Sequence, residues 1–141
     1  MITRITRSTQ ETEDFAAELV KKISRGTVIA FYGGLGMGKT AFTRGLAKGM
    51  GISAHVSSPT FAIVNDYGGN PPLVHFDMYK VESWDDLYSS GFFDYLDMGA
   101  VLAVEWSENI ENALPDSTVR VTIEKYEDEN SRLITVEGVE E

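Results

Sequence analysis

A glycine-rich segment after a short apolar run is the feature of this sequence that most restricts its fold. Residues 33–40 read GGLGMGKT and follow the run TVIAFY at residues 27–32. A run of this length and composition indicates a buried strand, and glycine at its end allows backbone conformations that side chains forbid. The helical pattern that begins near Lys39 completes a strand–loop–helix unit.

The same segment fits the pattern G-x-x-x-x-G-K-[ST], with Gly33, Gly38, Lys39 and Thr40 at the fixed positions. In such a loop, backbone N–H groups curl around a phosphate, and the following helix points its positive end at the same anion. We expect Lys39 to reach the β- and γ-phosphates and the Thr40 hydroxyl to bind Mg²⁺. A glycine-rich turn with a chance lysine is the alternative, but the strand before it and the helix after it favour phosphate binding.

Composition and charge limit the remaining function classes. The chain has 141 residues, which suits one domain spanning residues 1–141. It has no cysteine, and neither a signal peptide nor a membrane-spanning run is recognisable, so we expect a cytoplasmic protein without a membrane association. The formal net charge of −10 disfavours tight direct binding of nucleic acid. The acidity fits either a well-solvated surface or a docking face for a more basic partner.

The rest of the chain alternates between helical and extended patterns. Helices are predicted for residues 8–24, 39–48, 84–88, 92–96 and 107–113. Strands are predicted for residues 1–6, 28–32, 61–67, 73–78, 100–104, 118–124 and 133–136, the last two forming a terminal antiparallel hairpin around a charged turn at 126–130. Helices interleaved with buried strands predict an α/β fold: a three-layer domain of the P-loop NTPase type, with a mostly parallel central sheet and the hairpin as its extension.

A phosphate loop also needs groups that hold the metal and position the attacking water. Glu105 ends the apolar run VLAV and Asp77 ends LVHF, and a carboxylate there is costly unless it meets water, a partner or a metal. Either acid could bind Mg²⁺ or order the water. The hydroxyl-rich turn at residues 57–60 is either ordinary turn chemistry or a switch-like segment that reaches the metal. The two histidines are too few for a zinc cluster, and we expect His75 to line a strand.

Four segments together resemble one known family. They are GGLGMGKT at 33–40, SSPTF at 57–61, HFDMYK at 75–80 and VEW at 104–106, in the order and spacing of the bacterial TsaE family, also called YjeE. The likeness covers nearly the whole chain. It implies an ATP- and Mg²⁺-dependent ATPase, weak alone and stimulated by its partners. The partners implied are the TsaB and TsaD proteins, with which the family forms threonylcarbamoyladenosine at adenosine 37 of tRNAs that read codons beginning with A.

The resemblance also implies roles for particular residues. The catalytic set would be Lys39, Asp77, Glu105 and Thr60, with Mg²⁺ held by Thr40 and Glu105. The nucleotide would contact Thr9, Gly33, Gly36, Met37, Gly38, Lys39, Thr40, Ala41, Asp77 and Arg132. This chain departs from the family pattern at Gly34, Met37, Ala41 and Lys80, and the lysine at 80 replaces an arginine, which removes the geometry for bidentate pairing.

Two other functions stay open on the residues alone. A small-molecule or nucleoside kinase would use the same loop, but it needs a lid and an acceptor pocket, for which this chain has little spare length. A nucleotide-dependent binding module with negligible turnover fits the lack of an evident arginine finger in the chain. ATP is favoured over GTP because no Asn/Thr-Lys-x-Asp segment is present.

Overall fold

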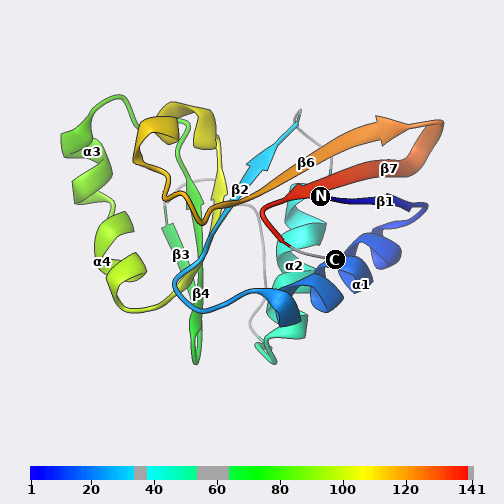
Figure 1. Cartoon of the computed structure of the whole chain (residues 1–141), viewed down its shortest axis with the longest axis horizontal. Coiled ribbons are helices and arrows are strands. Elements are labelled where there is room, and N and C mark those ends of the chain that lie inside the picture. The colour runs from blue at the N-terminus through cyan, green and yellow to red at the C-terminus, as the bar shows by residue number, and fades with distance from the viewer. Residues whose placement is uncertain (34–37, 54–63, 140–141) are drawn as a thin grey trace.

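A seven-stranded sheet forms the centre of the computed structural model, which describes residues 1–33, 38–53 and 64–139 (Figure 1). The strand order is β1-β7-β6-β2-β5-β4-β3. The strands are β1 (Ile2–Thr6), β2 (Val28–Tyr32), β3 (Val64–Gly69), β4 (Pro72–Asp77), β5 (Val101–Glu105), β6 (Val119–Tyr126) and β7 (Asp128–Glu137). The helices are α1 (Thr9–Leu19), η1 (Val20–Lys22), α2 (Lys39–Gly49), α3 (Trp84–Ser89), α4 (Phe92–Asp97) and η2 (Ser107–Ala113), where η marks a 3-10 helix.

The middle of the sheet is parallel and both of its edges are antiparallel. Strand β2 pairs in parallel with β6 and β5, and β5 pairs in parallel with β4. The pairs β3–β4, β6–β7 and β1–β7 are antiparallel. The predicted α/β class and the terminal hairpin are therefore confirmed, with a sheet that is mixed overall. Because β2, β5 and β4 point the same way, the segments that follow them start at one edge of the sheet.

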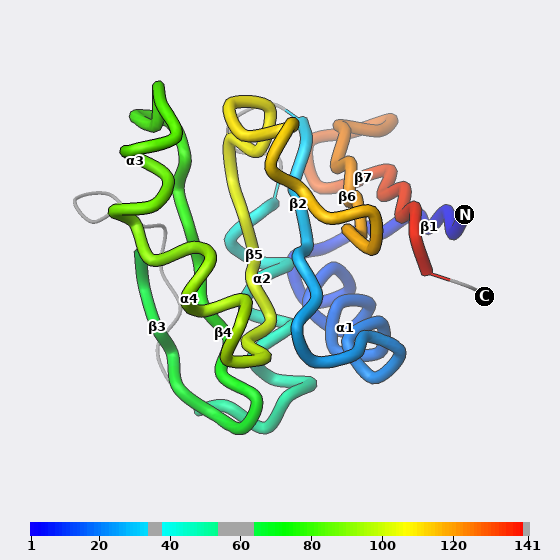
Figure 2. Tube along the Cα trace, turned by 60° about the vertical axis from the view of Figure 1, so that its left-hand side comes forward, coloured from blue at the N-terminus to red at the C-terminus, as the bar shows by residue number. Residues whose placement is uncertain are grey.

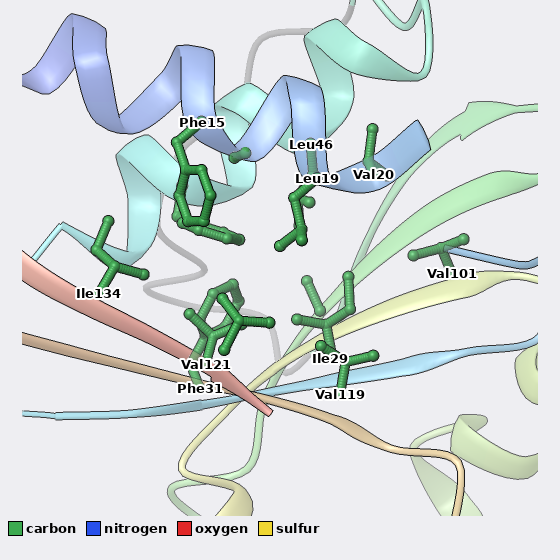
Figure 3. Packing of buried hydrophobic residues seen from close by; sticks show 14 of the residues in the cluster. Phe15, Leu19, Val20, Ile29, Phe31, Leu46, Val101, Val119, Val121 and Ile134 are labelled. Carbon is green, nitrogen blue, oxygen red and sulfur yellow. The ribbon is translucent and has the colours of Figure 1, made fainter. Parts of the chain in front are cut away.

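Helices cover both faces of the sheet, as the predicted three layers require. Helices α1 and α2 lie on one face and α3 and α4 on the other, which Figures 1 and 2 show from two directions. Successive residues of β2 separate into two cores, with Ile29 and Phe31 on the α1–α2 side and Val28 on the α3–α4 side. Figure 3 shows Phe15 of α1 and Leu46 of α2 above Phe31 of the sheet. The alternation explains why β2 reads as an unbroken apolar run: both of its faces are buried.

Helices α1 and α2 run side by side in the same direction. Two glycines of α2 let the helices approach each other closely. A Cβ added to Gly45 would lie 2.2 Å from the Glu13 carbonyl oxygen, and one added to Gly49 would lie 2.5 Å from that of Ala17. The helix predicted for residues 39–48 extends to Gly49, which serves this contact. The order of these contacts along both helices brings their two N-termini to the same end of the layer.

Several boundaries differ from the sequence prediction. The helix expected to reach residue 24 ends at Leu19, and a 3-10 turn follows it before Ile23 becomes extended. The expected turn at 126–130 is mostly strand, because Glu127 takes a positive φ of 34° and turns the chain at once. The alternation of apolar and polar residues did not predict this strand pairing, because most residues at this end of the hairpin are exposed, whichever face of the sheet they lie on. Of the strand expected at 61–67, only the part from Val64 lies within the described residues.

The described helices include none that is long and apolar enough to cross a membrane.

Candidate functional site

Two glycines hold the ends of the glycine-rich segment in conformations that other residues rarely adopt. Gly33 follows β2 with a φ of 117°, and an added Cβ would lie 2.2 Å from the carbonyl oxygen of Ile123 in β6. Gly38 is the N-cap of α2, with a φ of 105°. Gly36 and Met37 lie outside the described residues, so their expected nucleotide contacts stay predictions. Both described ends thus require glycine, one for space and both for backbone conformation.

The N-terminus of α2 carries positive charge that no described side chain neutralises. Gly38 supplies no capping group, and the first turn of the helix contains no acid. Lys39, the first helical residue, is only 9% exposed, and within the described ranges its ammonium forms no ion pair. A cation held at the positive end of a helix is unfavourable unless an anion joins it. This end of α2 therefore has the electrostatics of an anion site.

A hollow of about 140 Å³ opens beside this helix end. It lies between the starts of α1 and α2 and the β6–β7 hairpin, and it is lined by Ser8, Thr9, Thr12, Gly38, Ala41, Glu129, Asn130 and Arg132. The Arg132 guanidinium is anchored at its rim, donating to the carbonyl oxygens of Glu129 and Ser131 at 2.8 Å each. The structure thus brings together four of the expected nucleotide-contacting residues, Thr9, Gly38, Ala41 and Arg132, from three separate parts of the chain.

The two candidate acids end neighbouring strands on one face of the sheet. Asp77 and Glu105 are direct register partners at the ends of β4 and β5. Side chains two residues apart in a strand share a face, and Leu73 and Ala103, at even spacing from these acids, pack in the core beneath α1 and α2. Both carboxylates therefore lie on the face that carries the start of α2. Thr40, in the first turn of α2, is partly exposed.

The surroundings of the two acids differ sharply. Asp77 is partly exposed, and its Oδ1 accepts a hydrogen bond of 3.0 Å from the backbone N–H of Tyr79. Glu105 is 9% exposed, and its Oε2 lies 2.6 Å from Nε2 of His75. Asp77 thus shapes a local turn at the solvent boundary, whereas Glu105 is held inside the protein by another side chain.

His75 is the site residue whose partner the sequence pattern did not reveal. It lines a strand, as expected, but it is fully buried, and its Nδ1 lies 3.4 Å from the Tyr67 hydroxyl in addition to the contact with Glu105. The available signal was a histidine two positions before the strand-end acid Asp77, and therefore on the same face. Its neighbour across the sheet depends on strand order, which the sequence pattern does not give.

The chain turns abruptly after Glu105. Trp106 has a left-handed conformation, with φ 58° and ψ 36°, and its ring centroid lies 4.9 Å from that of Tyr79. Such a conformation is rare for a bulky residue and redirects the chain into η2. The side chain is half-buried against the aromatic ring that follows β4, so Trp106 joins the segments after both candidate acids.

A charged cluster braces the end of β2, next to Gly33. Glu111 of η2 accepts hydrogen bonds from the Tyr32 hydroxyl at 2.8 Å and from Arg120 of β6 at 2.7 Å. The Arg120 guanidinium, and then the Tyr32 hydroxyl, lower the pKa of Glu111. Burial raises the pKa of Tyr32, with Glu111 adding to the effect. The cluster ties three elements together at the strand from which the glycine-rich segment departs.

Two expectations about this edge lie partly beyond the described residues. Thr60, with the whole segment at 57–60, falls in a range that is not described, so its catalytic role stays a prediction.

Within the described ranges, no three residues of the His, Cys, Asp or Glu types gather as a metal site. At nucleotide sites Mg²⁺ is usually held by one or two side-chain oxygens together with phosphates and water, and Thr40 and Glu105 offer oxygens of that kind.

Fold and site together define a class: an α/β protein in which the glycine-rich segment and the strand-end acids come at the carboxyl ends of neighbouring parallel strands. Comparison with known proteins narrows this class. The family model described as "Threonylcarbamoyl adenosine biosynthesis protein TsaE" matches residues 6–134. The chain therefore belongs to the TsaE family, a family of tRNA threonylcarbamoyladenosine biosynthesis proteins, and the resemblance seen in its sequence is confirmed.

Individual relatives agree with this assignment. The tRNA threonylcarbamoyladenosine biosynthesis protein TsaE of Treponema pallidum is 34% identical over 132 residues, which cover 94% of this chain and 97% of that protein. The protein of the same name from Bacillus subtilis is 36% identical over 125 residues, or 88% of this chain and 78% of the relative. The crystal structure of Bacillus subtilis YdiB is similar with a TM-score of 0.79 at 32% identity, over 96% of this chain and 83% of that one.

Proposed function

We propose that this chain is a Mg²⁺-dependent ATPase that acts with TsaB and TsaD in forming the threonylcarbamoyl group on adenosine 37 of tRNAs that read codons beginning with A. Membership of the TsaE family supports the pathway. The observation that carries the ATPase part is Lys39: a residue only 9% exposed, at an uncapped helix N-terminus, whose ammonium has no described ion-pair partner. A nucleotide polyphosphate supplies the negative charge that this position lacks.

The site suggests where each part of the nucleotide lies. The phosphates would sit at the start of α2, where the backbone N–H groups and Lys39 converge. The hollow beside it, lined by Thr9, Ala41 and Arg132, is the natural place for the rest of the nucleotide. Arg132 is held by two carbonyl oxygens, so it is presented to a ligand without a large loss of side-chain freedom.

The roles of the acids follow from their surroundings. Thr40 and Glu105 would hold Mg²⁺, which when bound would neutralise charge on the β- and γ-phosphate oxygens. Asp77 lies one strand away, at the solvent boundary, where it would accept a hydrogen bond from the attacking water and orient it. Thr60, in the segment at 57–60, is proposed to approach the γ-phosphate.

The charge distribution supports action through partner proteins. Residues 81–119, which carry α3, α4, β5 and η2, contain nine Asp and Glu residues and no Lys or Arg. This acidic layer repels the phosphate backbone of tRNA. We therefore propose that contact with tRNA is made by TsaD and TsaB, and that this chain touches proteins rather than nucleic acid.

ATP hydrolysis by the purified chain, with and without the TsaB–TsaD pair of its organism, tests the proposal. Hydrolysis should be slow alone, should rise with the pair, and should fall by about 100-fold or more in Lys39→Ala, the scale seen when one preorganised electrostatic group is removed. Lys48→Ala is the matched control, because it removes a lysine from the same helix that pairs with Asp14 at 3.6 Å on the surface. Equal loss in both variants, or hydrolysis indifferent to the pair, contradicts the proposal.

The same assay addresses the kinase alternative. With labelled γ-phosphate, the proposed ATPase releases all label as inorganic phosphate. Label found on a metabolite in a mixture of nucleosides and small alcohols would instead identify a phosphoryl acceptor and assign the site to a kinase.

A further inference from the structure

His75 is a fully buried side chain with two polar contacts, and the roles proposed above do not use it. Its Nε2 lies 2.6 Å from Oε2 of Glu105, and its Nδ1 lies 3.4 Å from the Tyr67 hydroxyl. A buried imidazole needs a partner at each nitrogen. Both partners are present here, and the shorter contact is to the carboxylate.

The chemistry of the partners sets the direction of these hydrogen bonds. An ionised carboxylate only accepts, so Nε2 of His75 donates to Glu105. In a neutral imidazole Nδ1 is then the acceptor, and the Tyr67 hydroxyl is the donor placed beside it. The three side chains form one directed chain from β3 through β4 to β5. At 2.6 Å to a charged acceptor, its last bond is of the strong, charge-assisted kind.

This bond fixes one oxygen of Glu105 and leaves the other available. His75 of β4 lies opposite Ala103 of β5. Ala103 comes two residues before Glu105 in the same strand, so the side chains of His75 and Glu105 lie on the same face of the sheet. Among the described residues, only His75 donates a hydrogen bond to the Glu105 carboxylate, and the accepting atom is Oε2. The Glu105 side chain is 12% exposed, so it reaches the edge of the sheet from a buried anchor.

We propose that His75 is a positioning residue that holds the Glu105 carboxylate in the orientation in which it binds Mg²⁺. This inference rests on the proposed function, which places Mg²⁺ at Glu105. Hydrogen bonds to ligating side chains orient them, and their removal typically lowers metal affinity by about 10- to 100-fold. Asp77 has no equivalent support, since its described bond is to the backbone N–H of Tyr79. The buried histidine thus assigns the fixed metal ligand to Glu105 and leaves Asp77 as the more mobile acid.

Two substitutions at this position separate positioning from bulk. The amide nitrogen of glutamine in His75→Gln reaches the place of Nε2, whereas that of asparagine in His75→Asn reaches only the place of Nδ1. We expect His75→Asn to lower the Mg²⁺ affinity of the ADP-bound protein about 10- to 100-fold and to leave ADP affinity in EDTA unchanged. His75→Gln should retain most of the Mg²⁺ affinity. Calorimetric titrations of ADP over a range of Mg²⁺ concentrations measure both quantities, and thermal unfolding in EDTA compares the stability of the two variants.

Glu105→Gln shows whether His75 acts through Glu105. In that background, His75→Asn should cause no further loss of Mg²⁺ affinity. A further loss, or equal weakening of ADP binding with and without Mg²⁺, overturns the inference. Wild-type Mg²⁺ affinity in His75→Asn, while Glu105→Gln loses it, overturns the inference and leaves the proposed function standing. Unchanged Mg²⁺ affinity in Glu105→Gln itself removes the metal-binding role of Glu105 on which the inference rests.

Nuclear magnetic resonance of the nucleotide-free protein tests the same bond without a substitution of His75 itself. The chain contains only two histidines, so ¹⁵N-histidine labelling yields two ring systems. We expect one of them to carry its proton on Nε2, with a resonance that moves in Glu105→Gln and stays in Glu82→Gln, an exposed control acid. A proton on Nδ1 of His75, or a resonance indifferent to Glu105→Gln, overturns the inference.

Discussion

Two helices that lie side by side on one face of the sheet begin in opposite ways. The N-cap of α1 is Ser8, whose hydroxyl oxygen accepts from the backbone N–H of Glu11 at 3.1 Å, while the Glu11 carboxylate accepts from the N–H of Arg7 at 3.1 Å. The N-cap of α2 is Gly38, which has no side chain, and the next residue is the buried Lys39.

The difference shows which helix end is capped by side chains of the protein and which is not. Side-chain caps and an acid in the first turn satisfy orphan N–H groups and complement the helix dipole. Helix α1 has both, and α2 has neither within the described residues. Since the two ends are neighbours around one hollow, the protein stabilises one helix end with its own side chains and leaves the other uncapped, which supports the proposal that an anion binds there.

The largest expected effect comes from removing the charge that distinguishes α2. Lys39→Met should lower ADP affinity by about 100-fold or more. It should also raise the free energy of unfolding of the nucleotide-free protein by about 1 kcal/mol, because a charge that serves ligand binding destabilises the protein when the ligand is absent. Calorimetry with ADP and urea unfolding without nucleotide measure the two changes. If the variant is less stable than the wild type, Lys39 is part of the scaffold and the comparison with α1 fails.

A second prediction moves the two helix ends apart. Gly45→Ala should destabilise the protein by about 1–3 kcal/mol, because the new methyl group meets the backbone of Glu13. It should also weaken ADP binding, since the hollow depends on the spacing of α1 and α2. Gly49→Ala is the control: it strains the same interface near Ala17, farther from the hollow, so urea unfolding should show a similar loss with a smaller change in affinity. Equal affinity changes would mean that helix spacing does not shape the site.

Removing the cap of α1 should lower stability without changing phosphate binding at the start of α2. Ser8→Ala should reduce the free energy of unfolding by about 1 kcal/mol. Binding of inorganic pyrophosphate, which probes the start of α2 without filling the hollow, should stay as in the wild type. A loss of pyrophosphate binding as large as that in Lys39→Met would show that the two helix ends are one electrostatic unit.

The smallest expected effect concerns the strand before α2. Glu111→Gln weakens the bonds to Arg120 and Tyr32 and should cost about 0.5 kcal/mol or less at neutral pH, because the pair is largely exposed. The pKa of Glu111 is lowered in the folded state, so its contribution is present above the unfolded value of 4.5 and is lost as the pH falls through the folded value. Urea unfolding of both proteins between pH 7 and pH 3 should therefore show their difference shrink at the acid end. A difference that grows at low pH contradicts the assigned pairing.

Short-range patterns predicted much of this molecule. The apolar run before Gly33, the helical pattern that begins at residue 8 and the alternation in the last hairpin located β2, the start of α1 and the β6–β7 pair within a few residues. The glycine–lysine spacing predicted the start of α2 and an anion site there, of which the helix start is confirmed, and the strand-end positions of Asp77 and Glu105 marked the carboxyl edge. These features are local, because caps, turns and buried strands each depend on a few consecutive residues.

Sequence alone thus determined the α/β frame, and it predicts a phosphate-type loop on that frame, since backbone freedom and one cation at a strand end have few other uses. Only the tertiary structure decided which residues become neighbours. Strand order places His75 beside Glu105, and the close contact through Gly45 sets the starts of α1 and α2 around one hollow. The physical reason is that pairing across a sheet and packing between helices join residues far apart in the chain, and no periodicity within a single element records its partner.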